Sequence, residues 1–235
     1  MNYLKFGNSR DFIVFLHGWG ADKKSFLWLK EYFSEYSLIF LDFPGFGESE
    51  DPKRPYYVSD YVCELKNLLD KFEIDSLVIV GHSFGGRVAI KFSFLYQFDY
   101  SSFRLCLVDS AGILPKRTLK YYFRVYGYKL YKRFFPKSKK LNNFGSSDYR
   151  KLSFVMKKTF IRVVNEDLSN YAKFIKAKTL IVWGNEDNET KMFMAKKLKK
   201  LIKNSELKII DGAGHFSFLD KPVEFTIILD TFLKN

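Results

Sequence analysis

Apolar and polar positions alternate along the chain in a way that predicts strands and helices in turn. Short apolar runs rich in β-branched and aromatic residues predict buried strands, whereas apolar residues three or four positions apart predict amphipathic helices. The predicted strands are residues 3–6, 12–16, 38–41, 77–81, 103–108, 179–183 and 207–210. The predicted helices are residues 23–36, 57–72, 84–97, 191–202 and 222–233. Strands that alternate with helices are typical of a parallel sheet covered by helices, so the predicted fold class is α/β.

The alternation stops at Gly112 and resumes at Lys178. Between these points, residues 113–170 have helical spacing, many aromatic side chains and a basic composition. We therefore predict that they form an insertion between two strands of the sheet. The predicted domain organisation is a core made of residues 1–112 and 171–235, interrupted by this insertion.

The net charge of +13 is concentrated in the insertion. Residues 112–170 contain 15 Lys and Arg against 3 Asp and Glu, whereas the rest of the chain contains 24 against 23. Such a segment is compatible with a solvated lysine-rich surface and also with a docking face for an acidic partner. The sequence contains no recognised module for reading nucleic acid, which argues against nucleic acid as that partner.

Length and composition describe a protein with one sizeable core. A chain of 235 residues fits a single domain, and an apolar content of 47% excludes a disordered chain. No apolar run approaches the ~18 residues of a membrane span, and residues 1–10 lack the pattern of a signal peptide. Cys63 and Cys106 are interpreted as two reduced core thiols. We therefore expect a cytoplasmic protein without an integral membrane segment.

The candidate chemistry centres on Gly81-His82-Ser83-Phe84-Gly85, which follows an apolar strand and opens a predicted helix. Gly-x-Ser-x-Gly between a strand and a helix is the pattern of a nucleophile elbow, a sharp turn that exposes a serine hydroxyl. The two glycines leave room where the strained serine backbone passes close to its neighbours. Ser83 is therefore the predicted nucleophile.

A serine nucleophile needs a general base, and the chain has three histidines. His82 stands beside the serine in sequence, so its side chain is expected to point away into the core. His17 ends a predicted strand immediately before glycines. His215 follows the last predicted strand in Gly-Ala-Gly-His, where small residues let a loop bring the imidazole over the edge of the sheet. His215 is therefore the predicted base.

The base in turn needs a carboxylate to orient it. In the chain order Ser, acid, His, this acid stands at a strand end between Ser83 and His215. Asp187, which follows the strand before the histidine, is the predicted acid. Asp109, at the end of the strand after the elbow, is the alternative, and Glu186 is adjacent to Asp187 but one residue out of phase.

Acyl transfer also requires two backbone N–H groups that converge on a developing oxyanion. One is predicted to be that of Phe84, at the first turn of the helix after the nucleophile. The other is predicted to be that of Trp19, in the loop His17-Gly18-Trp19-Gly20. The Trp19 indole is also expected to line the acyl pocket. The sequence has no His, Cys or Asp cluster with metal-ligand spacing, so neither a metal nor an organic cofactor is expected.

Together these motifs resemble the α/β-hydrolase superfamily along nearly the whole chain. The matching residues are His17-Gly18-Trp19-Gly20, Asp42-Phe43-Pro44-Gly45-Phe46-Gly47-Glu48-Ser49, Gly81-His82-Ser83-Phe84-Gly85-Gly86, Gly184-Asn185-Glu186-Asp187 and Gly214-His215. The resemblance implies a mostly parallel sheet of eight strands with a helical lid after strand six, where residues 113–170 (the lid segment) stand. The short N-terminus predicts seven strands or a stunted edge. Serine at the elbow differs from the aspartate that the dehalogenases and epoxide hydrolases of this superfamily carry there.

The His-Gly-Trp-Gly opening and the small basic lid segment are similar to those of carboxylesterases that demethylate pimeloyl-acyl-carrier-protein methyl ester in biotin synthesis. That likeness implies an ester linked to acidic acyl carrier protein. The candidate docking residues are Arg124, Lys129, Lys132, Arg133, Lys139 and Lys140. The alternatives are an esterase, thioesterase or carbon–carbon bond hydrolase acting on a free small molecule, and a non-catalytic binding module of the same fold. An anionic membrane surface is a further candidate for contact with the lid segment.

Overall fold

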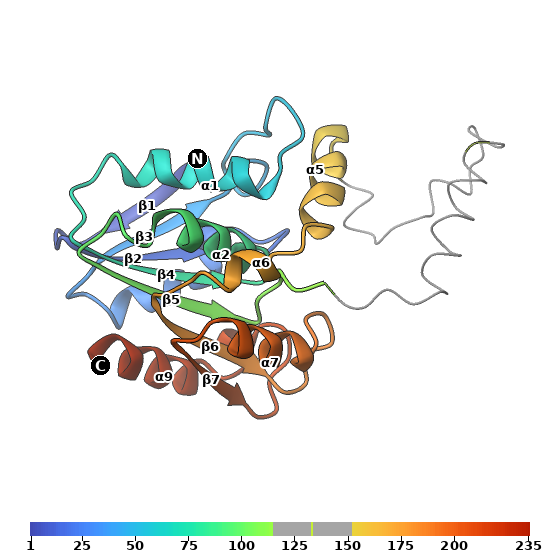
Figure 1. Ribbon diagram of the computed structural model, residues 1–235. Helices are drawn as coiled ribbons and strands as arrows, with labels where there is room; N and C mark the ends of the chain where they lie inside the picture. Colours follow the sequence, from blue (N-terminus) through green and yellow to red (C-terminus); the bar gives the residue numbers. More distant parts are fainter. Residues whose placement is uncertain (115–132, 134–151) are drawn as a thin grey trace.

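The computed structural model of the chain describes residues 1–114, 133 and 152–235. In this part of the chain one seven-stranded sheet forms the centre, with strand order β1-β3-β2-β4-β5-β6-β7 (Figure 1). The strands are β1 (Asn2–Phe6), β2 (Asp11–Leu16), β3 (Ser37–Asp42), β4 (Ser76–His82), β5 (Ser102–Val108), β6 (Lys178–Gly184) and β7 (Ser205–Ile210). All paired strands are parallel except β1, which runs antiparallel to β3. The predicted α/β class and the seven-strand alternative are confirmed.

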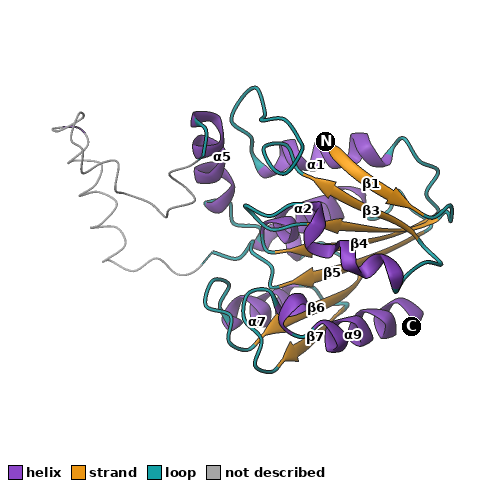
Figure 2. Ribbon diagram, turned by 180° about the vertical axis from the view of Figure 1, so that it is seen from behind, coloured by secondary structure: helices purple, strands orange, loops and turns teal. Residues whose placement is uncertain are grey.

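Helices cover both faces of the sheet (Figure 2). They are η1 (Lys23–Glu31), α1 (Val58–Leu69), α2 (Phe84–Tyr96), α5 (Phe154–Val164), α6 (Ser169–Ala172), α7 (Met192–Leu201), α8 (Ser217–Asp220) and α9 (Pro222–Lys234). Successive residues of a strand point to opposite faces, so the sheet divides the core in two. Ile79 of β4 lies in one half with α1, α2 and α7, whereas its neighbours Val78 and Val80 lie in the other half with η1 and α9.

Two sequence-based expectations about these elements are wrong. Residues 23–36 do not form an α-helix: the segment is η1, a nine-residue 3₁₀ helix that ends at Glu31. The spacing of three between its buried residues Phe26 and Leu29 fits a 3₁₀ helix as well as an α-helix, so the apolar pattern did not distinguish them. Cys63 is exposed, because it lies on the solvent side of the amphipathic helix α1, while Cys106 of β5 is buried as expected.

A buried lysine joins three segments beside the antiparallel edge of the sheet. Nζ of Lys23, at the start of η1, donates hydrogen bonds to Asn2 Oδ1 at 2.9 Å, Asp42 Oδ2 at 2.8 Å and Glu48 Oε2 at 2.7 Å. An ammonium has three N–H donors, so all of them have partners here. Burial opposes ionisation of Asp42, but the hydrogen bond and charge of Lys23 outweigh it and lower the pKa of that carboxyl. The network ties β1, η1 and the loop after β3 together.

The variant Lys23→Met is expected to lower the free energy of unfolding by about 3 kcal/mol at pH 7, because it leaves the buried Asp42 carboxylate without its cation. The deficit is expected to shrink as the pH falls toward about 4, where a carboxyl with a lowered pKa begins to lose the stabilisation it contributes at higher pH. Urea unfolding of both proteins across this range measures the difference. Lys24→Met, at the exposed neighbouring position, is the control and is expected to cost less than about 0.5 kcal/mol. Equal losses in the two variants would contradict the network.

Candidate active site

Ser83 lies at the turn between β4 and α2, in a backbone conformation that L-residues rarely adopt. Its φ is 49° and its ψ is −110°, and such strain persists only where the surroundings enforce it. A Cβ atom at Gly85 would lie 2.2 Å from the carbonyl oxygen of Leu16, and one at Gly81 would lie 2.8 Å from that of Gly85. The elbow predicted from Gly-x-Ser-x-Gly is therefore present, and its close packing requires both glycines.

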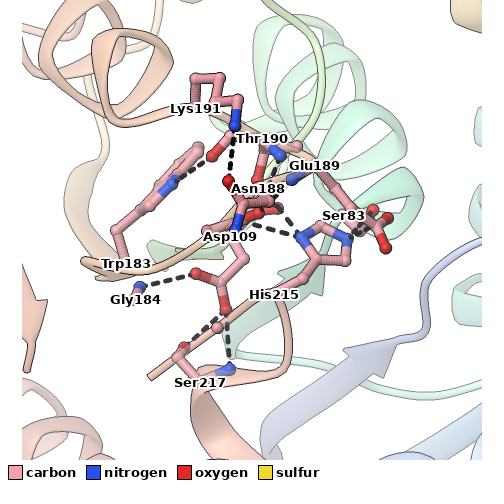
Figure 3. A network of polar contacts seen from close by, with 12 residues as sticks. Ser83, Asp109, Trp183, Gly184, Asn188, Glu189, Thr190, Lys191, His215 and Ser217 are labelled. Carbon is pink, nitrogen blue, oxygen red and sulfur yellow. Dashed lines mark hydrogen bonds and ion pairs between the residues drawn. The ribbon is translucent and has the colours of Figure 1, made fainter. Parts of the chain in front are cut away.

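Three side chains from distant parts of the sequence meet beside this turn. Nε2 of His215 lies 2.9 Å from Ser83 Oγ, and Nδ1 of the same ring lies 2.9 Å from Asp187 Oδ2. Figure 3 shows the His215 ring directed at Ser83. With Nδ1–H donating to the carboxylate, Nε2 is left to accept the serine O–H, which is the tautomer that a general base requires. The residues predicted as nucleophile, base and acid are thus hydrogen-bonded in that order.

The surroundings of this pair favour a charged carboxylate and a basic imidazole. The N–H groups of Glu189 and Thr190 donate to Asp187 Oδ1 at 2.7 and 2.9 Å, and the Thr190 hydroxyl donates to Oδ2. Burial alone would raise the pKa of Asp187. The hydrogen bonds from His215 and Thr190 outweigh burial, so the pKa of this carboxyl is lowered. Burial disfavours protonated His215, but the hydrogen bond and charge of Asp187 outweigh it and raise its pKa. His215 therefore gains a proton readily.

Asp109, the alternative acid, makes its hydrogen bonds elsewhere. Its fully buried carboxylate accepts the N–H of Gly184 at 2.9 Å, and both the N–H and the hydroxyl of Ser217 at 3.0 and 2.6 Å. Burial, only partly offset by these donors, raises the pKa of Asp109 to about 7. Of the two carboxylates, Asp187 is the one that the fold brings to the predicted base.

The other two histidines are buried and neutral. The Nε2–H of His82 donates to the carbonyl oxygen of His215 at 2.8 Å. His17 donates its Nδ1–H to the Gly18 carbonyl at 2.7 Å and accepts the Phe43 N–H at Nε2 at 3.0 Å. Burial lowers the pKa of His82 to about 3 and that of His17 to about 4. His82 is buried as predicted, but its bond to the backbone of His215 is a contact that the sequence did not indicate.

Trp19 and Phe84, the predicted oxyanion donors, both line the cavity that contains Ser83. Phe84 is the first residue of α2, so its N–H has no carbonyl partner within the helix. The ring of Trp19 packs edge-on against that of Phe84, with 5.3 Å between the ring centroids. The indole therefore lines the pocket as expected, and the assignment of the two N–H groups as oxyanion donors stays a prediction.

The cavity has a volume of about 710 Å³ and mostly apolar walls. Its described apolar lining includes Trp19, Phe84, Leu152, Phe160, Val163 and Phe216. Phe160 and Val163 belong to α5, so this helix of the lid segment forms one side of the cavity. Arg87 holds the end of α5, since its buried guanidinium donates to the carbonyl oxygens of Val164 and Glu166. The sequence reasoning missed Arg87, because an arginine in a helix is ordinarily a solvated side chain and its partners here lie far away in the sequence.

A second carboxylate reaches the predicted base from the mouth of the cavity. Oε2 of Glu189 lies 3.4 Å from Nε2 of His215, and the Glu189 side chain is 70% exposed. The negative charge of Glu189 also raises the pKa of His215, although its effect is smaller than those of burial and of Asp187. Sequence patterns gave no indication of this contact.

The remaining site predictions concern the lid segment and bound groups. Arg124, Lys129, Lys132, Lys139 and Lys140 lie outside the described residues, and Arg133 is the one docking candidate within them. The core boundaries at residues 112 and 171 also stay a prediction. Among the described residues, no group of three or more His, Cys, Asp and Glu is arranged to hold a metal ion. None of the helices in this same part of the chain is both long enough and apolar enough for a membrane span.

The fold and the arrangement of the site are those of an α/β-hydrolase, and comparison with known proteins gives the same class. A model of the Alpha/beta hydrolase family matches residues 13–227, so the chain belongs to that family. Lipase 1 of Psychrobacter immobilis is 28% identical, over 94% of this chain and 76% of that protein. The AB hydrolase superfamily protein YisY of Bacillus subtilis is 25% identical, over 94% and 90%. An esterase from Exiguobacterium antarcticum has a TM-score of 0.78 at 21% identity, covering 99% of this chain and 95% of that one.

The variant Glu189→Gln is expected to move the acidic limb of the pH profile of kcat/KM to lower pH, measured with a small aryl ester. That limb reports the pKa of the base in the free enzyme, and removing a nearby carboxylate lowers the pKa of His215. Because the Glu189 side chain is 70% exposed, the shift is expected to be only about 0.2–0.5 pH unit at low ionic strength. Glu186→Gln, in the same loop, is the matched control and should leave the limb in place. Coincident profiles for wild type and Glu189→Gln would rule the contact out.

Proposed function

We propose that this chain is a carboxylic-ester hydrolase that works through a triad of Ser83, His215 and Asp187. The observation that carries the proposal is the unbroken hydrogen-bonded relay from Ser83 Oγ through both ring nitrogens of His215 to Asp187, beside an apolar cavity. An acceptor at Nε2 and a donor at Nδ1 are what a base needs to take the serine proton and carry the resulting charge. A relative named as a lipase and a structural neighbour named as an esterase support an ester substrate.

The proposed reaction has two acyl-transfer steps. Ser83 Oγ attacks the ester carbonyl while His215 Nε2 takes its proton, and the N–H groups of Trp19 and Phe84 stabilise the tetrahedral oxyanion. His215 then gives the proton to the departing alcohol, which leaves an acyl-serine. Water, deprotonated by the same imidazole, attacks this acyl group, releases the acid and restores Ser83. Asp187 holds the imidazole tautomer and stabilises its protonated form in both steps.

The walls of the cavity favour an apolar acyl group. Trp19, Phe160 and Val163 offer aromatic and aliphatic surface beside Ser83, and a volume of about 710 Å³ falls in the range of pockets that enclose small organic molecules. Burial of each methylene of an acyl chain contributes roughly 0.8 kcal/mol. Esters of medium-length apolar acids are therefore expected to have the highest kcat/KM in a panel that varies acyl length.

A fluorophosphonate probe is expected to label the wild-type chain at Ser83 and to leave Ser83→Ala unlabelled, because the probe reacts with an activated serine. Hydrolysis of an aryl ester is expected to fall at least about 10⁴-fold in Ser83→Ala and in His215→Ala. Intact-protein mass spectrometry and initial rates measure both effects. Ser93→Ala is the control, since Ser93 is a buried serine of α2 whose hydroxyl donates to the Ala89 carbonyl within the helix.

Other outcomes would replace this proposal. A folded wild-type chain that binds an ester yet never reacts with the probe would be a binding module of the same fold. A chain that reacts with the probe and turns over thioesters, or cleaves only carbon–carbon bonds, would be a serine hydrolase of another substrate class. The panel therefore includes a thioester and a carbon–carbon substrate beside the esters.

We further propose that the lid segment docks acidic acyl carrier protein, so that the natural ester is carrier-linked. The support is charge: residues 112–170 carry 15 basic against 3 acidic side chains, while the rest of the chain is nearly balanced. A concentration of positive charge raises the encounter rate with an acidic partner, and this attraction weakens as the salt concentration rises. The lid residues named for this role are Arg124, Lys129, Lys132, Arg133, Lys139 and Lys140.

Reversing three of these charges together, in Lys132→Glu/Arg133→Glu/Lys139→Glu, is expected to raise KM for a carrier-linked methyl ester about tenfold or more at low salt. Because small neutral esters need no docking surface, their kcat/KM is expected to stay within about twofold. Lys199→Glu/Lys200→Glu, on α7 outside the lid segment, is the control. Unchanged turnover of the carrier-linked ester in the triple variant would end the carrier proposal, and salt-sensitive binding to anionic vesicles instead would identify a membrane surface as the partner.

A further inference from the structure

Ser83 and Asp109 are the two non-glycine residues with positive φ in the described part of the chain, at 49° and 43°. They follow the ends of adjacent parallel strands, β4 and β5, whose last residues pair in register. Strain of this kind persists where the surrounding structure over-determines the backbone, and it gathers at functional sites. The strain at Ser83 presents the nucleophile. Asp109 also has a positive φ and is fully buried, yet it stands outside the relay of the triad.

The carboxylate of Asp109 joins the two loops that carry the predicted acid and base. Oδ1 accepts the N–H of Gly184, the last residue of β6, three positions before Asp187. Oδ2 accepts the N–H and the hydroxyl of Ser217, two positions after His215. Figure 3 shows Asp109 between Gly184 and Ser217, with its two oxygens directed to opposite sides. One buried side chain therefore bridges loops that are far apart in the sequence.

The backbone of Asp109 makes further contacts with the same part of the structure. Its carbonyl oxygen lies 3.0 Å from the Thr190 hydroxyl, which also contacts Asp187 Oδ2. Its N–H donates to the Val182 carbonyl of β6 at 3.0 Å. Asp109 thus contacts the strand end, the acid loop and the base loop from one position.

We propose that Asp109 is a positioning residue that sets the distance and orientation between Asp187 and His215, acting through Gly184 and Ser217 without touching the substrate. The inference rests on the proposed triad. A carboxylate can accept hydrogen bonds at both oxygens, whereas an amide of the same shape accepts at one and presents N–H donors at the other. In the variant Asp109→Asn, the amide oxygen can accept a backbone N–H from one of the two loops. The amide NH₂ then faces the backbone N–H of the other loop, and two donors cannot form a hydrogen bond. A displacement of about 1 Å in a reacting group is enough to lower a rate by about 100-fold.

The first test compares kinetic constants. Asp109→Asn is expected to lower kcat for an aryl ester about 10- to 100-fold while KM stays within about threefold, because binding surfaces are untouched and the relay is misaligned. Ser217→Ala removes the hydroxyl and keeps the N–H, so its kcat is expected to fall only about 2- to 5-fold. The double variant is expected to be no slower than Asp109→Asn alone, since both changes act through one contact.

The second test does not depend on turnover. The proton of His215 Nδ1–H, hydrogen-bonded to Asp187, gives a low-field proton resonance that reports the geometry of this bond. It is expected to be sharp in the wild type and in Ser83→Ala, and shifted or broadened in Asp109→Asn. Asp42→Asn is the matched control, because Asp42 is another fully buried carboxylate, at the end of β3, with several donors of its own. Its Tm is expected to fall while its low-field resonance stays in place.

The outcomes separate this inference from the proposed function. If Asp109→Asn loses only thermal stability, with kcat and the resonance as in the wild type, Asp109 has a purely structural role and the proposal is overturned. If Asp109→Asn does not fold, Ser217→Ala decides, and an unchanged kcat with an unchanged resonance there overturns it. A wild type that neither reacts with the fluorophosphonate nor hydrolyses esters removes the proposed function, while the resonance still tests the positioning of His215.

Discussion

The parallel register of β4, β5, β6 and β7 is the constraint on which the rest of the structure depends. Because these strands run in one direction, their carboxyl ends lie along a single edge of the sheet. The turns and loops that leave this edge carry Ser83, Asp109, Asp187 and His215 in succession. No local structure could bring these side chains together, since each is separated from the next by a helix, a loop or an insertion. The sheet fixes where each of these turns and loops begins, and the loops determine the final positions of the side chains.

The three histidines illustrate how the same residue type takes different roles through its surroundings. His17 and His82 are buried without a carboxylate partner, and burial lowers their pKa values to about 4 and about 3. They act as neutral hydrogen-bonding groups that hold the loop before Trp19 and the backbone of His215. His215 is also buried in part, but the charge of Asp187 reverses the effect and raises its pKa. One carboxylate therefore separates the histidine that can accept a proton from the two that cannot.

The sequence carried enough information to predict the sheet and the meeting of the relay residues. Ser83 stands in a local motif, and elimination among three histidines leaves His215 as the base. The place of Asp187 one strand before the histidine favours it over Asp109. Local patterns failed where the outcome depends on tertiary contacts. The 3₁₀ geometry of η1 depends on packing that apolar spacing does not encode, whereas the exposure of Cys63 follows from its place on the solvent side of the amphipathic helix α1.

The groups that the sequence did not reveal are those that act across long separations. Arg87 reaches carbonyl oxygens of Val164 and Glu166, nearly eighty positions away. Glu189 meets His215 only because two loops face each other at the sheet edge. Neither has a local signature, since an arginine in a helix or a glutamate in a loop is ordinarily a solvated side chain. Such contacts become predictable only once the strand order is known.

Asp109 and Asp187 lie along one edge of the same sheet, and their environments push their acidities apart. Asp187 receives donors that include the basic imidazole, so its pKa is lowered and it stays charged. Asp109 is enclosed with neutral donors, and burial raises its pKa to about 7. A carboxyl whose pKa rises on folding stabilises the fold below its unfolded pKa and loses that contribution as the pH rises through the folded value. Ionised Asp109 therefore opposes folding above neutral pH. Its hydrogen bonds to Gly184 and Ser217 offset part of this cost and connect the two loops.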